Sequence, residues 1–271
     1  MSKSDQTGEI KVMDGAMGTL LLAHGISIHS CIPEVNLTRP TLVTEIHKSY
    51  VTAGAEAILT NTFGANRPRL KTFKKEQRLQ SINRSAVRIA KKAAGSLPVF
   101  ASIGPLGPNS KKMTFTQMVQ NFREQASVIE KEKPSGYLIE SIPSLAEAKA
   151  ATLAVREASD RTCITLLSFP AGSKIPSFSE ISKTLRAAGA DLIGFNCGKG
   201  PQEIYELLKA LAQVDKGPFC VRPAGGLPGK IIRPEEFASW GPKFQKLGCT
   251  WIGGCCGTTP SHIQALKTAL T

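Results

Sequence analysis

The sequence predicts a single α/β domain folded as a (β/α)8 barrel, the TIM barrel fold. Its 271 residues match the ordinary size of such a barrel. Eight short apolar segments alternate with eight segments of helical periodicity, and most of the helical segments end at or near a glycine. This alternation indicates a parallel sheet with right-handed crossovers, and eight units favour a closed barrel. An open doubly wound sheet is the alternative, but the fingerprint GxGxxG is absent after the first strand.

The first half of the chain supplies four pairs of strand and helix. Asp14 follows the first strand in a glycine-bearing turn that is expected to expose its carboxylate. Residues 1–9 are predicted to form a polar tail outside the domain, which spans residues 10–271, and residues 23–40 an irregular insert. The predicted strands are residues 10–13, 56–60, 97–103 and 136–139, and the predicted helices are residues 41–53, 77–94, 115–131 and 145–158.

The second half of the chain repeats the pattern. The fifth strand is a β-branched run, and the sixth is followed directly by Asn196 and Cys197. The eighth strand leads into a loop that contains two adjacent cysteines among glycines. The predicted strands are residues 162–167, 191–195, 218–221 and 250–252, and the predicted helices are residues 179–188, 201–213, 234–247 and 260–269.

Charge and composition exclude several classes of protein. The formal net charge is +13, but the Lys and Arg residues are dispersed and lack the interleaved aromatics that stack nucleic-acid bases. The charge instead favours an acidic protein partner. No apolar run approaches the roughly 20 residues of a membrane span, and the first ten residues are polar, which predicts a cytoplasmic protein. An odd number of cysteines, seven, argues against a disulfide framework in that compartment.

The candidate catalytic and metal-binding residues follow the C-terminal ends of the predicted strands, which is where barrel enzymes place their reacting groups. Cys197 follows strand six, and Cys255 and Cys256 follow strand eight. The fold therefore places three thiols at the same open end of the barrel, the end at which the strands terminate, called the mouth below. Three thiolates around Zn²⁺ leave one tetrahedral position open, which is typical of a catalytic site. The alternative is that cysteines serve as small apolar core residues, which is the interpretation adopted for Cys163, Cys220 and Cys249.

A zinc site of this kind suits alkyl transfer to a substrate thiol, because a thiol bound to the metal loses its proton at neutral pH. Asp14 and Glu140, at the ends of strands one and four, are expected to hold an ammonium group, and backbone N–H groups of glycine-rich loops a carboxylate. The acceptor is then an amino acid that bears a thiol. In the alternative, Asp14 caps the following turn and Glu140 belongs to an ion pair at the rim.

These residues resemble the homocysteine S-methyltransferase family over residues 9–270. The resemblance implies a barrel in which Cys197, Cys255 and Cys256 bind Zn²⁺ and in which homocysteine is methylated to methionine. Asp14, Gly15, Thr62 and Glu140 are the residues expected to bind homocysteine. The matching motifs are Asp14-Gly15-Ala16-Met17-Gly18-Thr19, Thr60-Asn61-Thr62-Phe63-Gly64, Ser102-Ile103-Gly104-Pro105, Glu140, Asn196-Cys197 and Gly253-Gly254-Cys255-Cys256-Gly257-Thr258-Thr259-Pro260.

Within the family, residues 34–40 and 61–65 look most like the homocysteine-binding module of cobalamin-dependent methionine synthase. No folate- or cobalamin-binding portion accompanies them, so methylcobalamin carried by a separate protein is the expected donor. The alternatives are S-methylmethionine as donor, or a barrel that binds a thiol or an amino acid without catalysis. A further alternative is a phosphate-binding lyase on the same fold, and the only feature in its favour is Lys199 between Gly198 and Gly200.

Two loops depart from the family's pattern. Residues 168–176, after strand five, form a shorter loop than usual, and residues 221–226, after strand seven, differ in sequence. In the second of these stretches, Arg222 is expected to add a positive charge to the rim. These departures bear on the choice of acceptor, donor and docking partner.

Overall fold

The computed structural model describes residues 10–170, 172–227 and 230–271 of the chain. The predicted tail, residues 1–9, lies outside the described residues. One sheet of eight parallel strands has the order β1-β10-β7-β6-β5-β4-β3-β2. Its strands are β1 (Lys11–Val12), β2 (Ile58–Leu59), β3 (Val99–Ile103), β4 (Gly136–Ile142), β5 (Thr162–Leu167), β6 (Leu192–Cys197), β7 (Phe219–Pro223) and β10 (Cys249–Ile252).

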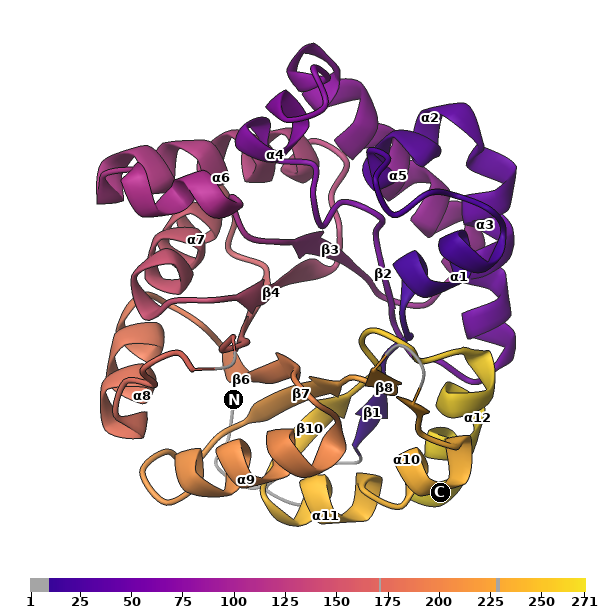
Figure 1. Cartoon of the computed structure of the whole chain (residues 1–271), viewed down its shortest axis with the longest axis vertical. Helices are drawn as coiled ribbons and strands as arrows, with labels where there is room; N and C mark the ends of the chain where they lie inside the picture. The colour runs from indigo at the N-terminus through magenta and orange to yellow at the C-terminus, as the bar shows by residue number, and fades with distance from the viewer. Residues whose placement is uncertain (1–9, 171, 228–229) are drawn as a thin grey trace.

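The sheet closes between its two edge strands, β1 and β2. Met13 and Ala57 form a parallel bridge, and the Asp14 N–H donates to the Ala57 carbonyl at 3.0 Å. The strands therefore curl into a barrel, and Figure 1 shows them around the centre with the helices outside. The predicted (β/α)8 fold is confirmed.

Helices cover the outside of the barrel. Ser or Thr side chains cap the N-termini of three of them: Thr114 before α6, Ser144 before α7 and Ser177 before α8. The α-helices are α1 (Met17–Ala23), α2 (Val35–Thr38), α3 (Pro40–Thr52), α4 (Arg67–Lys71), α5 (Leu79–Ala94), α6 (Phe115–Glu130), α7 (Leu145–Ala158), α8 (Phe178–Ala187), α9 (Pro201–Leu211), α10 (Pro234–Ala238), α11 (Gly241–Lys246) and α12 (Pro260–Leu270), and the 3₁₀ helices are η1 (Ile32–Glu34), η2 (Glu76–Arg78) and η3 (Pro108–Lys112).

Three predictions about individual elements are wrong. The predicted helix 234–247 is two helices, α10 and α11, because Pro242 has no N–H to continue the first one. Residues 23–40 are not irregular throughout, since they include η1 and α2. The fourth strand does not stop at residue 139, because β4 continues to Ile142 with a register shift against β5.

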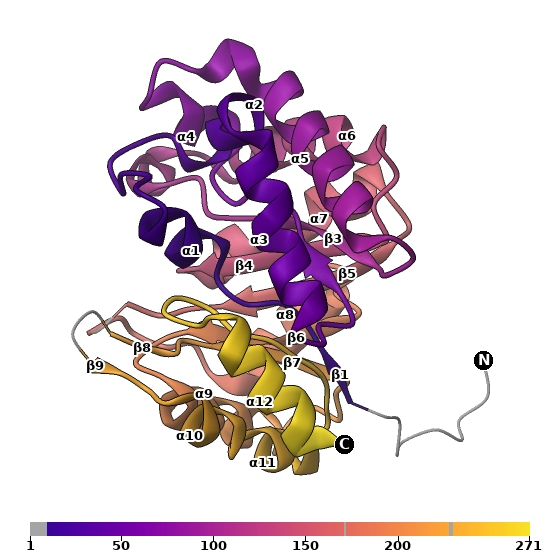
Figure 2. The same cartoon turned by 90° about the vertical axis from the view of Figure 1, so that its right-hand side faces the viewer.

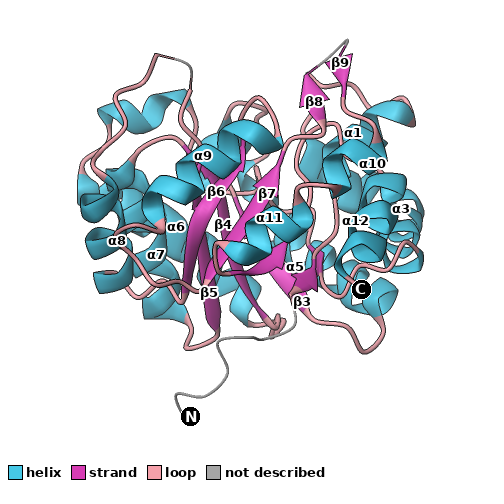
Figure 3. Cartoon of the chain, turned by 90° about the horizontal axis from the view of Figure 1, so that it is seen from below, coloured by secondary structure: helices cyan, strands magenta, loops and turns pink. Residues whose placement is uncertain are grey.

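The C-terminal end of the barrel carries additional short elements. α1 follows β1, α4 follows β2, and a hairpin of β8 (Gly226–Leu227) and β9 (Lys230–Ile231) follows β7. Figures 2 and 3 show α1 and the hairpin at the same end of the barrel. The hairpin was not predicted. Among the described residues, no helix combines the length and apolarity needed to cross a bilayer.

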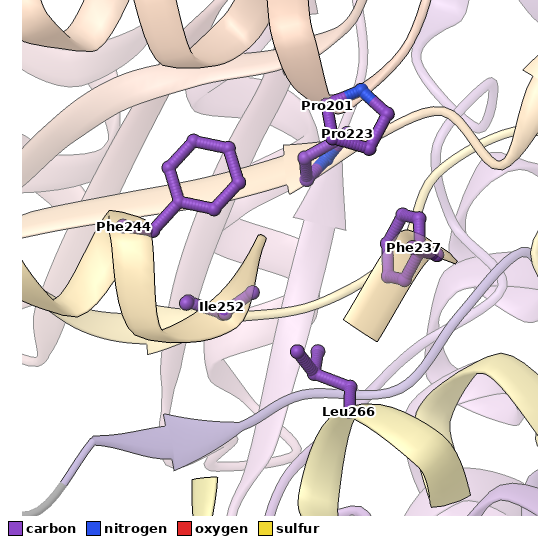
Figure 4. A pocket seen from close by; sticks show the side chains of 7 residues that line it. Pro201, Pro223, Phe237, Phe244, Ile252 and Leu266 are labelled. Carbon is purple, nitrogen blue, oxygen red and sulfur yellow. The ribbon is translucent and has the colours of Figure 1, made fainter. Parts of the chain in front are cut away.

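The core has two layers, inside the barrel and between the sheet and the helices. Inside, alternate residues of successive strands meet, and Phe100 packs edge-on against Trp251 with ring centroids 5.6 Å apart. Outside, helices α9 to α12 pack on β7 and β10, where apolar side chains converge with no polar group among them (Figure 4). Because strands alternate, the inward positions above this inner layer include Ser102, Glu140, Asn196 and Arg222.

Candidate metal centre and acceptor site

Three thiols gather at the C-terminal end of the barrel. β6 ends at Cys197, and the loop after β10 carries Cys255 and Cys256. Their sulfur atoms all lie within 4.8 Å of one another, and the sulfurs of Cys197 and Cys256 are 3.9 Å apart. The sheet order β10-β7-β6 brings these two cysteines together although they are 59 positions apart in the chain.

The spacing and chemistry of the three sulfurs fit one zinc ion. Tetrahedral Zn–S bonds of about 2.3 Å place sulfur atoms roughly 3.8 Å apart, close to the separation of Cys197 and Cys256. Thiolates are soft ligands of the kind that zinc accepts. Three of them leave the fourth tetrahedral position of the metal open to a further ligand.

The thiols also influence one another's protonation. Hydrogen bonds with Cys197 and Cys255 lower the pKa of Cys256, whereas hydrogen bonds with its two neighbours raise the pKa of Cys197. One thiolate beside protonated thiols is therefore the state that the cluster favours by itself. A divalent cation is the group that stabilises three thiolates at this separation.

Asn196 positions the cysteine cluster. Its side-chain amide donates to the sulfur of Cys255 at 3.7 Å and to the hydroxyl of Ser141 at 2.8 Å. Its carbonyl oxygen accepts the Ser141 N–H at 2.8 Å. Because Asn196 is fully buried, these contacts fix the end of β4 against the cysteine loop. Ser141 was not predicted as a site residue.

The cysteine loop is fastened to both neighbouring strands. The N–H groups of Gly253 and Cys255 donate to carbonyls of β7, and the Gly254 N–H donates to the Asp14 carbonyl at 3.0 Å. A Cβ on Gly254 would lie 2.3 Å from the hydroxyl oxygen of Thr258, so only glycine fits there. That hydroxyl donates to the Cys255 carbonyl at 2.7 Å. The glycines allow the backbone to turn tightly enough to present both thiols.

Asp14 is buried, and the prediction that its turn exposes the carboxylate is wrong. The residue is 2% exposed. Its Oδ1 accepts from Arg222 Nη1 at 3.0 Å, and its Oδ2 accepts the Leu59 N–H at 2.8 Å. Burial raises the pKa of Asp14 to about 6, although the Arg222 charge opposes the shift. The turn cannot expose Asp14 because barrel closure places the Leu59 N–H of β2 and the Arg222 side chain of β7 against its carboxylate.

Glu140 and Arg222 complete a cluster of buried charges. Glu140 Oε1 accepts from the Ser102 hydroxyl at 2.6 Å, and its Oε2 lies 3.9 Å from Arg222 Nε, beyond hydrogen-bond distance. Burial raises the pKa of Glu140, and the nearby guanidinium opposes the shift. Arg222 was expected at the rim, but it points inward from β7 and pairs with Asp14. The alternation along β7, which places Arg222 on the same face as Cys220, was the signal that could have located it.

The two remaining residues predicted to bind the substrate lie at the ends of β1 and β2. The Gly15 carbonyl accepts from Arg222 Nη2 at 3.4 Å, and a Cβ on Gly15 would lie 2.8 Å from atoms of Thr258 and Tyr50. The Thr62 hydroxyl is fully buried and donates to the Ser102 carbonyl at 2.6 Å. Substrate binding by these two residues stays a prediction.

All seven cysteines are free. Cys163, Cys220 and Cys249 are buried in strands and contribute to the core, as expected of small apolar side chains. Cys31 is buried in a separate small cluster with Leu70, Leu79, Ile82 and other apolar residues. The cysteines outside the cluster at the mouth are thus packing residues.

Comparisons with known proteins agree with this geometry. A family model described as Homocysteine S-methyltransferase matches residues 11–270. The chain is 31% identical to a methionine synthase of Mycobacterium tuberculosis (strain ATCC 25618 / H37Rv) and 30% identical to one of Mycobacterium leprae (strain TN). Each alignment covers 96% of this chain, which spans only 24% of the length of either relative.

Among solved structures, the fold resembles that of MmuM, a homocysteine methyltransferase from Escherichia coli crystallised in a metallated form. The TM-score is 0.82, the sequence identity is 23%, and the alignment covers 96% of both chains. At this identity the likeness supports the fold.

Proposed function

The chain belongs to the homocysteine S-methyltransferase family, and from this premise we propose that it methylates the thiol of homocysteine to give methionine, with Zn²⁺ held by Cys197, Cys255 and Cys256. The observation that carries the proposal is the cluster of three sulfurs within 4.8 Å of one another at the C-terminal end of the barrel. Zinc bound there supplies the charge that keeps the acceptor thiol deprotonated at neutral pH.

The residues around the thiols hold the rest of the acceptor. Glu140 Oε2 lies beyond hydrogen-bond distance of Arg222 and is offered to the acceptor's ammonium. Asp14, Gly15 and Thr62 are proposed to shape the same site from the ends of β1 and β2. In the reaction, a lone pair of the acceptor sulfur forms the new S–CH₃ bond, and the electron pair of the broken bond stays with the donor.

The methyl donor in this proposal is methylcobalamin carried by a protein part outside this barrel. In the two methionine synthases, about three quarters of the length lies outside the part that this chain matches. Residues 67–78, between β2 and α5, contain six Lys or Arg and one Glu, which suits an acidic partner. Exposed apolar side chains lie on the segments that follow β1, β2, β5 and β7, and are proposed to contribute to the docking surface: Leu22 on α1, Phe63, Ile175, and Ile231 on β9. A cytoplasmic location suits the seven free thiols.

The test measures zinc content and single turnover in the same protein. Zinc-loaded protein and homocysteine are mixed in parallel with methylcobalamin, S-methylmethionine and S-adenosylmethionine, and methionine is quantified. We expect about one zinc per chain and methionine from methylcobalamin. If only S-methylmethionine gave methionine, it would be the donor in place of methylcobalamin. Homocysteine binding without turnover from any donor would indicate a non-catalytic barrel.

The matched variants are Cys256→Ser and Cys163→Ala. Cys256→Ser removes one of three sulfur ligands, so we expect loss of most bound zinc and at least a hundredfold slower methylation. Cys163→Ala alters a buried cysteine of β5 in the core and should keep the zinc. If Cys256→Ser retained full zinc content and rate, the proposed site would be wrong.

A further inference from the structure

A cluster of three buried charges lies beside the thiols. Asp14 at the end of β1, Glu140 on β4 and Arg222 on β7 project into the upper layer of the barrel interior. The side chains of Asp14 and Arg222 are only 3% and 4% exposed, and that of Glu140 is 10% exposed. Charges this well shielded from water act strongly on any charged group bound next to them.

The contacts of Asp14 leave it little capacity for a ligand. One carboxylate oxygen accepts from Arg222 and the other from the Leu59 N–H. Arg222 also cancels the Asp14 charge at a separation of 3.0 Å. An ammonium that enters the site therefore meets one uncompensated carboxylate, Glu140, with a guanidinium at its side.

The contacts of Arg222 go beyond those of a structural ion pair. Its two terminal nitrogens donate to Asp14 and to the Gly15 carbonyl, but its buried Nε has no hydrogen-bond partner. A buried donor on a charged group that has no partner lowers stability, so an arginine with a purely structural role would be expected to have this nitrogen paired. The unpaired Nε faces Glu140 Oε2 at 3.9 Å, so the guanidinium is placed against the carboxylate offered to the acceptor.

We propose that Arg222 is a specificity-determining residue that weakens the site's preference for thiols bearing an ammonium over thiols without one. It does so by neutralising Asp14 and by placing a positive charge next to Glu140. This inference rests on the proposed function, because it concerns the acceptor site of the same methyl transfer. The substrate class that it adds is thiol carboxylates that lack the amino group.

The test compares two thiols that differ only in the amino group. Calorimetry gives the Kd of homocysteine and of 4-sulfanylbutanoate for zinc-loaded protein, with no methyl donor present. The ratio of the two Kd values is then measured in Arg222→Met, Asp14→Asn and the double variant. Arg222→Met removes the guanidinium beside Glu140 and leaves Asp14 to pair with an incoming ammonium, so it should shift the ratio about tenfold toward homocysteine. Asp14→Asn leaves the guanidinium uncompensated and should shift it about tenfold the other way.

The double variant removes one negative and one positive charge, so Glu140 remains and the net charge of the cluster equals that of the wild type. The ratio should therefore return to within about threefold of the wild type. Opposite shifts that cancel cannot arise from a general loss of structure. Arg186→Met is the control, because it breaks an ion pair with Asp215 on the outside of the barrel and should leave the ratio unchanged.

Two outcomes contradict the inference. If zinc-loaded Asp14→Asn and the double variant both keep the wild-type ratio of the two Kd values, Arg222 does not set specificity. This conclusion does not require that Arg222→Met folds. If the wild-type protein holds zinc but binds neither thiol, the proposed function fails and this inference with it. Binding of both thiols with unchanged ratios overturns the inference alone.

Discussion

Cys197 and Ser141 have backbone conformations that residues other than glycine seldom adopt. Their φ angles are +64° and +58°. Cys197 is the last residue of β6 and Ser141 the second-last of β4, and these two strands flank β5 in the sheet. Such conformations cost of order 1–3 kcal/mol each and persist only where surrounding contacts impose them. For Ser141, Asn196 supplies those contacts, because its side chain binds the backbone N–H and hydroxyl of Ser141 as well as the sulfur of Cys255. At Cys197, the backbone carbonyl accepts the Ala224 N–H at 3.0 Å.

Asn196→Ala should therefore weaken zinc binding without removing a ligand. Residues that orient metal ligands typically contribute 10- to 100-fold in affinity, so we expect a loss of about that size. Competition with a chromophoric chelator measures it. Asn121→Ala is the control, since Asn121 donates only within its own helix, to the Gln117 carbonyl. An Asn196→Ala protein that binds zinc within twofold of wild type would contradict the positioning role.

Between helix α8 and the connection from α9 to β7, Asp215 joins several elements. It accepts hydrogen bonds from Arg186, from the Ser182 hydroxyl at 2.6 Å and from the Gly217 N–H at 2.7 Å. Burial would raise the pKa of Asp215, but these hydrogen bonds outweigh it and hold the pKa below its ordinary value. The ionised carboxylate thus stabilises the packing of α8 against the connection that leads from α9 to β7.

Asp215→Asn should lower the free energy of unfolding by about 2 kcal/mol at pH 7. Because the folded-state pKa is below the unfolded value of about 3.9, the stabilisation is complete above that pH and declines as pH falls through the folded-state pKa. Urea unfolding at pH 7 and at pH 3 measures both effects. Glu157→Gln, which breaks an exposed pair with Arg123, should change stability by less than about 0.5 kcal/mol. An equal loss for Asp215→Asn at both pH values would exclude ionisation as the cause.

Closure of the whole barrel and assembly of the site occur at the same place. β1 pairs with β10 and bridges to β2, and the turn after β1 lies against the cysteine loop. Tyr50 of α3 reinforces this contact, since its hydroxyl lies within hydrogen-bond distance of the carbonyls of Ala16 and Thr258. The position of the thiols therefore depends on how the two ends of the sheet meet.

Gly15→Ala tests this dependence. Its new methyl group would lie 2.8 Å from Thr258 and Tyr50 atoms, so we expect a loss of about 1–3 kcal/mol in stability together with weaker zinc binding. Gly18→Ala, within α1, meets nothing within 4 Å and should stabilise the protein by roughly 0.5–1 kcal/mol. Thermal unfolding and chelator competition measure both. If zinc affinity were unchanged in Gly15→Ala, the position of the thiols would not depend on how the two ends of the sheet meet.

The sequence by itself determined the alternation of elements and the motif of glycines and cysteines. Helical and strand periodicities are local, because each is written in residues a few positions apart, and the bounds of α7 and β5 were predicted without error. The split between α10 and α11 was also readable, since Gly241 and Pro242 interrupt the helical pattern there. Eight such units predict a closed barrel, and a closed barrel brings Cys197, Cys255 and Cys256 to the same end of the molecule.

The tertiary structure decided how the charges are distributed. Asp14 and Arg222 are 208 positions apart, and no periodicity links them. Their pairing depends on strand register, on inward or outward side-chain direction and on closure between β1 and β2, all of which are set by the assembled barrel. Burial then turned a carboxylate expected to be exposed into half of an ion pair. Local spacing specifies which residues reach the mouth, whereas contacts across the barrel specify which of their charges remain for a ligand.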